Sequence, residues 1–167
     1  SDDTIELCTN TKCSYLSFIF IFFIWIFHFT INNNSKLTLL TTSYYPECKD
    51  IRNQIWRLIT SNFIHIDLNH LLGNSLFLFP LMIICEKIID KIYILFIIFI
   101  GCITSSLYLY FIIPYYEVLG SSGIVFDLLG ILFGYTILNF DSLNFYFIIM
   151  NAFIISLLVG LEIISYL

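Results

Sequence analysis

Gly120-Ser121-Ser122-Gly123 stands at the start of an apolar run that extends to Leu138. A hydroxyl at membrane depth is costly unless a protein interior or a cavity receives it, so serines between glycines need a reason here. The stretch predicts a helix N-terminus that presents a hydroxyl beside unpaired backbone N–H groups. We take this end of the helix as the candidate functional site, with nucleophilic catalysis as the hypothesis.

Composition indicates a membrane protein. The 167 residues are 59% hydrophobic and only 11% charged, and their mean hydropathy is +0.93. A soluble domain of this length has no interior large enough to hide that much apolar surface. The net charge of -5 and the lack of a basic patch argue against nucleic acid as a partner. The predicted class is an all-α, polytopic transmembrane helical bundle that contacts the lipid bilayer.

Five apolar segments are predicted to cross the bilayer, whose hydrocarbon core is about 30 Å thick, as helices. A polar segment, 1–13, precedes them, and a membrane-associated loop, 32–63, separates the first two. The lysine and arginine counts on the two sides are too close to fix the orientation. The predicted spans are 14–31, 68–85, 92–113, 122–138 and 145–167.

Three shorter features modify this outline. Ile55 to Ile59 reads Ile-Trp-Arg-Leu-Ile, an amphipathic piece expected to lie on or just inside the membrane surface. Trp25 and His28 fall near the end of the first span, where amphipathic rings favour the interface. The charged residues from Glu86 to Lys91 predict a tight turn between the second and third spans.

A second polar cluster, His65, His70 and Asn74, enters the second span. His70 and Asn74 are four residues apart, so they share one helix face, and both side chains can donate hydrogen bonds. The second and fourth spans begin on the same side of the membrane, whichever way the chain is oriented. The two polar clusters therefore lie at similar depth, and one shared site explains both. A serine, helix N-terminal amides and two side-chain donors amount to a nucleophile with an oxyanion hole.

At these residues the chain resembles the rhomboid family of intramembrane serine proteases. The resemblance covers about residues 55 to 138 and implies a core of six helices, five of which are present here. The motifs that carry it are Trp56-Arg57, His65…His70…Asn74, Glu86 at the exit of the second span, and Gly120-Ser121-Ser122-Gly123.

The resemblance implies a function and a role for each motif. Ser122 would be the nucleophile, and His70, Asn74 and the Ser122 amide would bind the oxyanion. Substrates would be single-pass transmembrane proteins, cleaved within the membrane, and no metal or cofactor would be used. The compartment would be the secretory pathway or the plasma membrane rather than the mitochondrial inner membrane. Residues with structural or cavity roles would be His65, Trp56, Arg57, Gly120, Gly123, Asp127 and Glu86.

The sequence departs from the family pattern in its general base, which in the family is a histidine on the sixth helix. The histidines here are His28, His65 and His70, and none follows the fourth span. Three explanations stay open: the sequence is an incomplete part of an active protease, the protein is a pseudoprotease that binds transmembrane clients, or His70 or His28 serves as the base. Asp127 also departs from the family, which usually has a small residue there, and we expect its carboxylate to face the cavity.

Simpler readings exist for several of these residues. Gly130 and Gly134 form a G-x-x-x-G pair, so the glycines of the fourth span could serve close helix packing alone. An unrelated channel or transporter would need a polar stripe through several spans, which the third and fifth spans lack. Cysteine spacing predicts no metal site, and a disulfide from Cys8 to Cys13 or Cys48 stays open.

Overall fold

The chain folds into a bundle of helices. The computed structural model describes residues 14–32, 55–112 and 119–165. Within those ranges there are helices and turns and no β-strand, which confirms the all-α prediction. The disulfide alternatives for Cys8 lie outside the described residues. The long helices are α2 (Tyr15–Asn32), α5 (Leu68–Ile88), α6 (Lys91–Ile112), α7 (Ser122–Leu138) and α8 (Phe145–Ser165), and the short elements are α4 (Arg57–Thr60) and the 3₁₀ turns η2 (Ser61–Phe63) and η3 (Phe140–Ser142).

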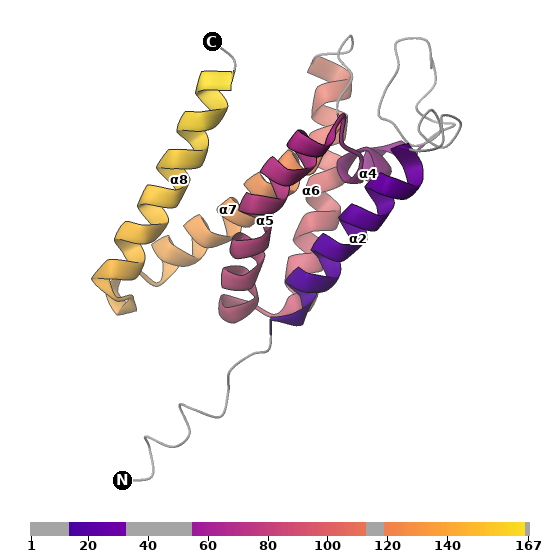
Figure 1. Ribbon diagram of the computed structural model, residues 1–167. Coiled ribbons are helices and arrows are strands. Elements are labelled where there is room, and N and C mark those ends of the chain that lie inside the picture. The colour runs from indigo at the N-terminus through magenta and orange to yellow at the C-terminus, as the bar shows by residue number, and fades with distance from the viewer. Residues whose placement is uncertain (1–13, 33–54, 113–118, 166–167) are drawn as a thin grey trace.

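Helix α5 packs against α2 and α7, and α7 also contacts α6 and α8 (Figure 1). Helix α8, yellow in Figure 1, meets α7 near one end and leans away from the rest of the bundle. On α7 the apolar side chains at four-residue intervals turn to one side and bury completely, as a helix period requires. Fully buried apolar side chains on α5 and α7 include Leu71, Leu78, Met82, Cys85, Ile124, Leu128 and Leu132.

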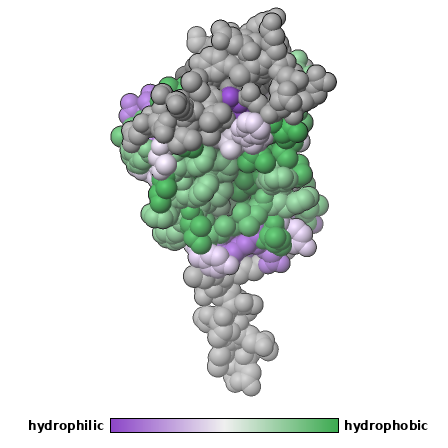
Figure 2. Space-filling view, turned by 90° about the vertical axis from the view of Figure 1, so that its right-hand side faces the viewer, coloured by the Kyte–Doolittle hydropathy of each residue, from purple (hydrophilic) through white to green (hydrophobic). Residues whose placement is uncertain are grey.

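The outer surface is apolar over a broad belt. Figure 2 shows this belt in green on one face of the bundle, with hydrophilic patches above and below it. Two described helical stretches, Leu68–Ile88 and Lys91–Tyr108, are long and apolar enough to cross a membrane. The other apolar stretches are shorter, namely Tyr15–Ile31, Ser122–Leu138 and Phe145–Ser156. Together with the belt, these lengths are typical of a membrane protein.

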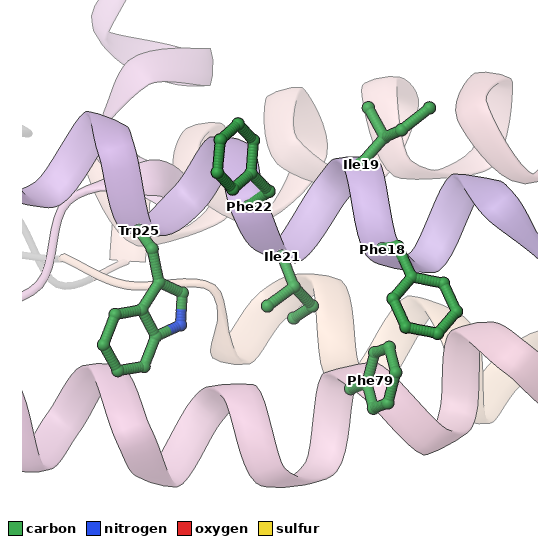
Figure 3. Close-up of a pocket in the computed structure, with 6 residues that line it drawn as sticks. All are labelled: Phe18, Ile19, Ile21, Phe22, Trp25 and Phe79. Carbon is green, nitrogen blue, oxygen red and sulfur yellow. The ribbon is translucent and has the colours of Figure 1, made fainter.

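An apolar groove runs along the surface between α2 and α5 (Figure 3). The rings of Phe18 and Phe79 meet edge to face across it, with centroids 5.0 Å apart. The indole Nε1–H of Trp25, for which the sequence predicts a place near the membrane interface, donates to Ser75 Oγ on α5 at 3.0 Å. The Ser75 hydroxyl in turn donates to the carbonyl of Leu71 at 2.7 Å. This polar contact ties the middle of α2 to α5 beside the apolar groove.

The charged turn is shorter than the sequence predicts. Helix α5 continues to Ile88, so Glu86 and Lys87 lie inside it, and only Ile89 and Asp90 separate it from α6. Pro80 is accommodated within the helix. The helix can continue because the Glu86 carboxylate finds hydrogen-bond donors on another helix, as described below.

Candidate active site

The turn before α7 has a backbone conformation that favours glycine. Gly120 has a φ of 109°, the region that L side chains rarely adopt. Its amide donates to the carbonyl of Ser61 at 3.1 Å, which fastens the turn to η2. A Cβ at this position would lie 2.7 Å from Cε1 of His70 and 3.3 Å from Nδ2 of Asn74. The glycine therefore lets the turn approach both side chains closely.

His70 and Asn74 reach the turn from the first two turns of α5. Asp67 caps that helix, because its carboxylate accepts the amide of His70 at 2.8 Å. The side-chain Nδ2 of Asn74 is buried and has no hydrogen-bond partner among the described residues. A buried amide donor without an acceptor is costly, on the order of 1–3 kcal/mol, so such an atom marks a place where a ligand oxygen would be favourable.

Ser122 is the first residue of α7 and is partly buried. Its amide belongs to the first helical turn, whose N–H groups have no carbonyl acceptor within the helix. The positive end of the helix dipole is also located there and favours a developing negative charge. Ser122 thus follows Gly120 by two residues, on the same turn that His70 and Asn74 face.

The hydroxyl that pairs with an imidazole is that of the neighbouring residue, Ser121. His65 Nε2 lies 3.1 Å from Ser121 Oγ, and both residues are only 1% exposed. By resemblance, the sequence assigns the nucleophile to Ser122 and gives Ser121 no role of its own, because the partner of Ser121 depends on the backbone geometry of the turn.

All three histidines of the chain lie together. The His65 ring centroid is 5.2 Å from that of His70 and 6.1 Å from that of His28. Burial is the largest cause that lowers the pKa of His65, to about 4, and the nearby His70 and His28 lower it further. A hydrogen bond with the backbone of Phe63 acts in the opposite direction. His65 is therefore neutral at neutral pH and is a weak base. The described residues contain no group of three or more His, Cys, Asp or Glu side chains placed to hold a metal ion.

The segment that contains Trp56 and Arg57 is joined through η2 to the turn before α7. Arg57 is buried, whereas Trp56 remains 47% exposed. The carbonyl of Leu58 accepts the Asn62 side-chain amide and the Ser106 hydroxyl of α6, both at 2.9 Å. Because the Ser61 carbonyl holds Gly120, this segment connects α6 to the turn at the start of α7.

The glycines of α7 do not share one role. A Cβ on Gly123 would lie 3.4 Å from Ser105 Oγ of α6, so this glycine packs against a neighbouring helix. A Cβ on Gly130 or Gly134 would meet no described atom within 4 Å. Close packing through the G-x-x-x-G pair therefore has no support in the described residues.

A comparison with known protein families identifies the domain to which these residues belong. The sequence profile described as Rhomboid domain matches residues 52–166, which is more than half of the chain. The chain belongs to the rhomboid family. The match starts before the Trp56-Arg57 segment and includes η2, α5, α6, α7 and α8. No curated protein sequence matches the chain.

In this rhomboid domain Glu86 holds the start of α2 and is fully buried. Its two carboxylate oxygens accept the amides of Leu16, at 3.1 Å, and Ser17, at 2.7 Å. The carboxylate thus caps a helix N-terminus, where both the free amides and the helix dipole favour a negative charge. Lys91 Nζ lies 3.9 Å from the same group.

Asp127, whose carboxylate is expected from the sequence to face a cavity, packs against α6. Its carboxylate lies against Gly101 of α6, so closely that a Cβ at Gly101 would overlap it. One carboxylate oxygen, Oδ2, is buried and has no hydrogen-bond partner among the described residues. The rotation of α7 that points Ile124 and Leu128 toward the core turns Asp127 toward α6.

Proposed function

We propose that the protein is a rhomboid-type serine endopeptidase, a multi-pass membrane protein that cleaves single-pass transmembrane proteins within the bilayer. Ser122 is the nucleophile, and the oxyanion hole consists of Asn74 Nδ2, the His70 imidazole and the Ser122 amide. The observation that carries the proposal is that His70 and Asn74 meet at Gly120, with the Asn74 donor buried and without a partner among the described residues. No cofactor takes part, and the membrane belongs to the secretory pathway or is the plasma membrane.

The chemistry follows from these positions. Ser122 Oγ bonds to the carbonyl carbon of the substrate peptide, its proton passes to a base, and the carbonyl oxygen becomes an oxyanion. The oxyanion accepts hydrogen bonds from Asn74 and His70, which stabilise the negative charge as it develops. The intermediate then expels the amine with a proton from the base, and water hydrolyses the acyl ester. In the rhomboid family the base is a histidine on the sixth helix, and these 167 residues hold no histidine after Ser122.

A pseudoprotease that binds transmembrane clients is the second candidate. It is favoured by one observation: the imidazole that bonds a serine, His65, pairs with Ser121 rather than Ser122. Its pKa of about 4 also makes it a poor general base at neutral pH. In the described part of the chain, then, Ser122 has no imidazole partner.

One experiment separates the two candidates. The full-length gene product is reconstituted in liposomes with a single-pass transmembrane substrate that has small residues near its membrane boundary, and Ser122→Ala is the control. The protease proposal predicts cleavage that Ser122→Ala abolishes and fluorophosphonate labelling at residue 122. Cleavage that survives this substitution would remove Ser122 from the mechanism. Absence of both cleavage and labelling, with client binding unchanged by Ser122→Ala, would establish the pseudoprotease.

A further inference from the structure

The hydrogen bond between His65 and Ser121 has no part in the reaction described above. We propose that it is a latch that holds the Gly120–Ser122 turn against the start of α5, which makes His65 and Ser121 positioning residues for Ser122. The proposal rests on the proposed function, because positioning matters only if Ser122 reacts.

The latch acts at the residue next to the nucleophile. Gly120 and Ser121 each bond to the short segment from Ser61 to His65: the Gly120 amide to the Ser61 carbonyl, and the Ser121 hydroxyl to the His65 imidazole. His65 lies two residues before Asp67, the cap of the helix that carries His70 and Asn74. A shift of the latch would therefore move the nucleophile relative to its oxyanion donors, and a misplacement of about 1 Å can cost about 100-fold in rate.

The protonation state of His65 is consistent with a hydrogen bond of fixed direction to Ser121. The Ser121 amide lies 3.5 Å from the same His65 Nε2 that the hydroxyl meets at 3.1 Å. A backbone N–H can only donate, so Nε2 is the acceptor for both groups and the imidazole is neutral. The low pKa of His65 keeps this arrangement across neutral pH.

Burial favours a positioning role for Ser121 over a nucleophilic one. Both residues of the pair are 1% exposed, so water cannot replace their hydrogen bond and a peptide substrate has no direct access to the Ser121 oxygen. Ser122, the next residue, is partly exposed and starts the helix. The two adjacent serines thus divide into one that holds the turn and one that reacts.

The test uses the full-length protein with Ser121→Ala, and Ser105→Ala as the matched control. Ser105 lies near Gly123, and among the described residues its hydroxyl bonds within α6, to the carbonyl of Cys102. Hydrogen exchange is measured on peptides covering residues 119–125, and kcat and KM are measured on a transmembrane substrate. For Ser121→Ala we expect exchange at least about 5-fold faster in this segment, unchanged exchange in α6, and a kcat about 10-fold lower with an unaltered KM. Ser105→Ala should change none of these.

A second variant keeps the proposal falsifiable if one substitution disturbs folding. His65→Gln retains a side-chain amide that can bond Ser121. Amide hydrogens of residues 119–125 should therefore exchange more slowly in His65→Gln than in His65→Ala. The double variant His65→Ala with Ser121→Ala should be no worse than His65→Ala alone, because both remove the same bond. Additive losses, or exchange unchanged by Ser121→Ala, would overturn the latch, and so would fluorophosphonate labelling of Ser121. If the full-length protein lacks protease activity, the proposed function fails, while the exchange data still decide whether the latch exists.

Discussion

A side chain on Gly120 would begin 2.7 Å from Cε1 of His70, two residues before Ser122. The turn that leads into α7 and the first turns of α5 are therefore in direct contact, although they are far apart in the sequence. This contact brings the candidate oxyanion donors to the serine end of α7, and it exists only because residue 120 lacks a Cβ.

Gly120→Ala should destabilise the protein and abolish activity. The methyl group would be strained at a φ of 109° and would press on His70, with an expected cost of about 2 kcal/mol or more. Thermal unfolding in detergent and a cleavage assay measure the two effects. Gly130→Ala is the matched control: a Cβ there meets no described atom within 4 Å, so the helix should gain up to about 1 kcal/mol. Equal effects of the two substitutions would contradict the contact at residue 120.

Glu86→Ala should lower the free energy of unfolding by about 3 kcal/mol, because two backbone amides of α2 lose their charged acceptor inside the bundle. Glu86→Gln retains one acceptor oxygen and should lose less. Asp141→Ala, at an exposed carboxylate in η3, serves as the control and should have little effect. If Glu86→Ala unfolds at the wild-type temperature, the capping role is wrong.

The stability of the protein should fall on mild acidification because of His65. Its pKa is about 4 in the folded chain and 6.5 in the unfolded chain. Between these two values the unfolded chain binds a proton that the folded chain does not, so the free energy of unfolding decreases as the pH falls. The stabilisation is complete above about pH 6.5 and is lost toward pH 4, at a total of about 3 kcal/mol.

Denaturation curves of the wild type and of His65→Gln, recorded between pH 7 and pH 4, would check this. The variant has no titrating group at residue 65, so its stability should change less over the same interval. Parallel pH profiles of the two proteins would show that His65 is not the group responsible.

Gly101→Ala should be destabilising by about 2 kcal/mol, because the new methyl group overlaps the Asp127 carboxylate between α6 and α7. In the double variant with Asp127→Ala, this obstacle is removed and most of the lost stability should return. Thermal unfolding of the two single variants and the double variant gives the coupling. A double variant that shows the sum of both single losses would mean that the two residues do not meet.

The all-α fold could be predicted because apolar segments of about 20 residues have few other solutions. The placement of His70 and Asn74 at the turn before Ser122 follows from span order and from the four-residue spacing on one helix face. Neither inference needs knowledge of side-chain packing.

Other features depend on contacts that no local pattern reveals. Glu86 reads as a turn residue until the α2 amides, some 70 residues away in the sequence, are seen to satisfy its carboxylate. The choice of Ser121 rather than Ser122 as the partner of His65 depends on the backbone angles of the turn. The direction of Asp127 depends on the rotation of α7 about its own axis, which the all-round apolar sequence of this helix leaves open.

The structure of the full-length protein after reaction with a fluorophosphonate would test the central claim most directly. The phosphorus atom should be bonded to Ser122 Oγ, with its oxygen about 3 Å from Asn74 Nδ2 and within reach of His70. An adduct on Ser121, no adduct at all, or a phosphoryl oxygen more than about 5 Å from Asn74 Nδ2 would contradict the account, since a hydrogen bond cannot span that distance.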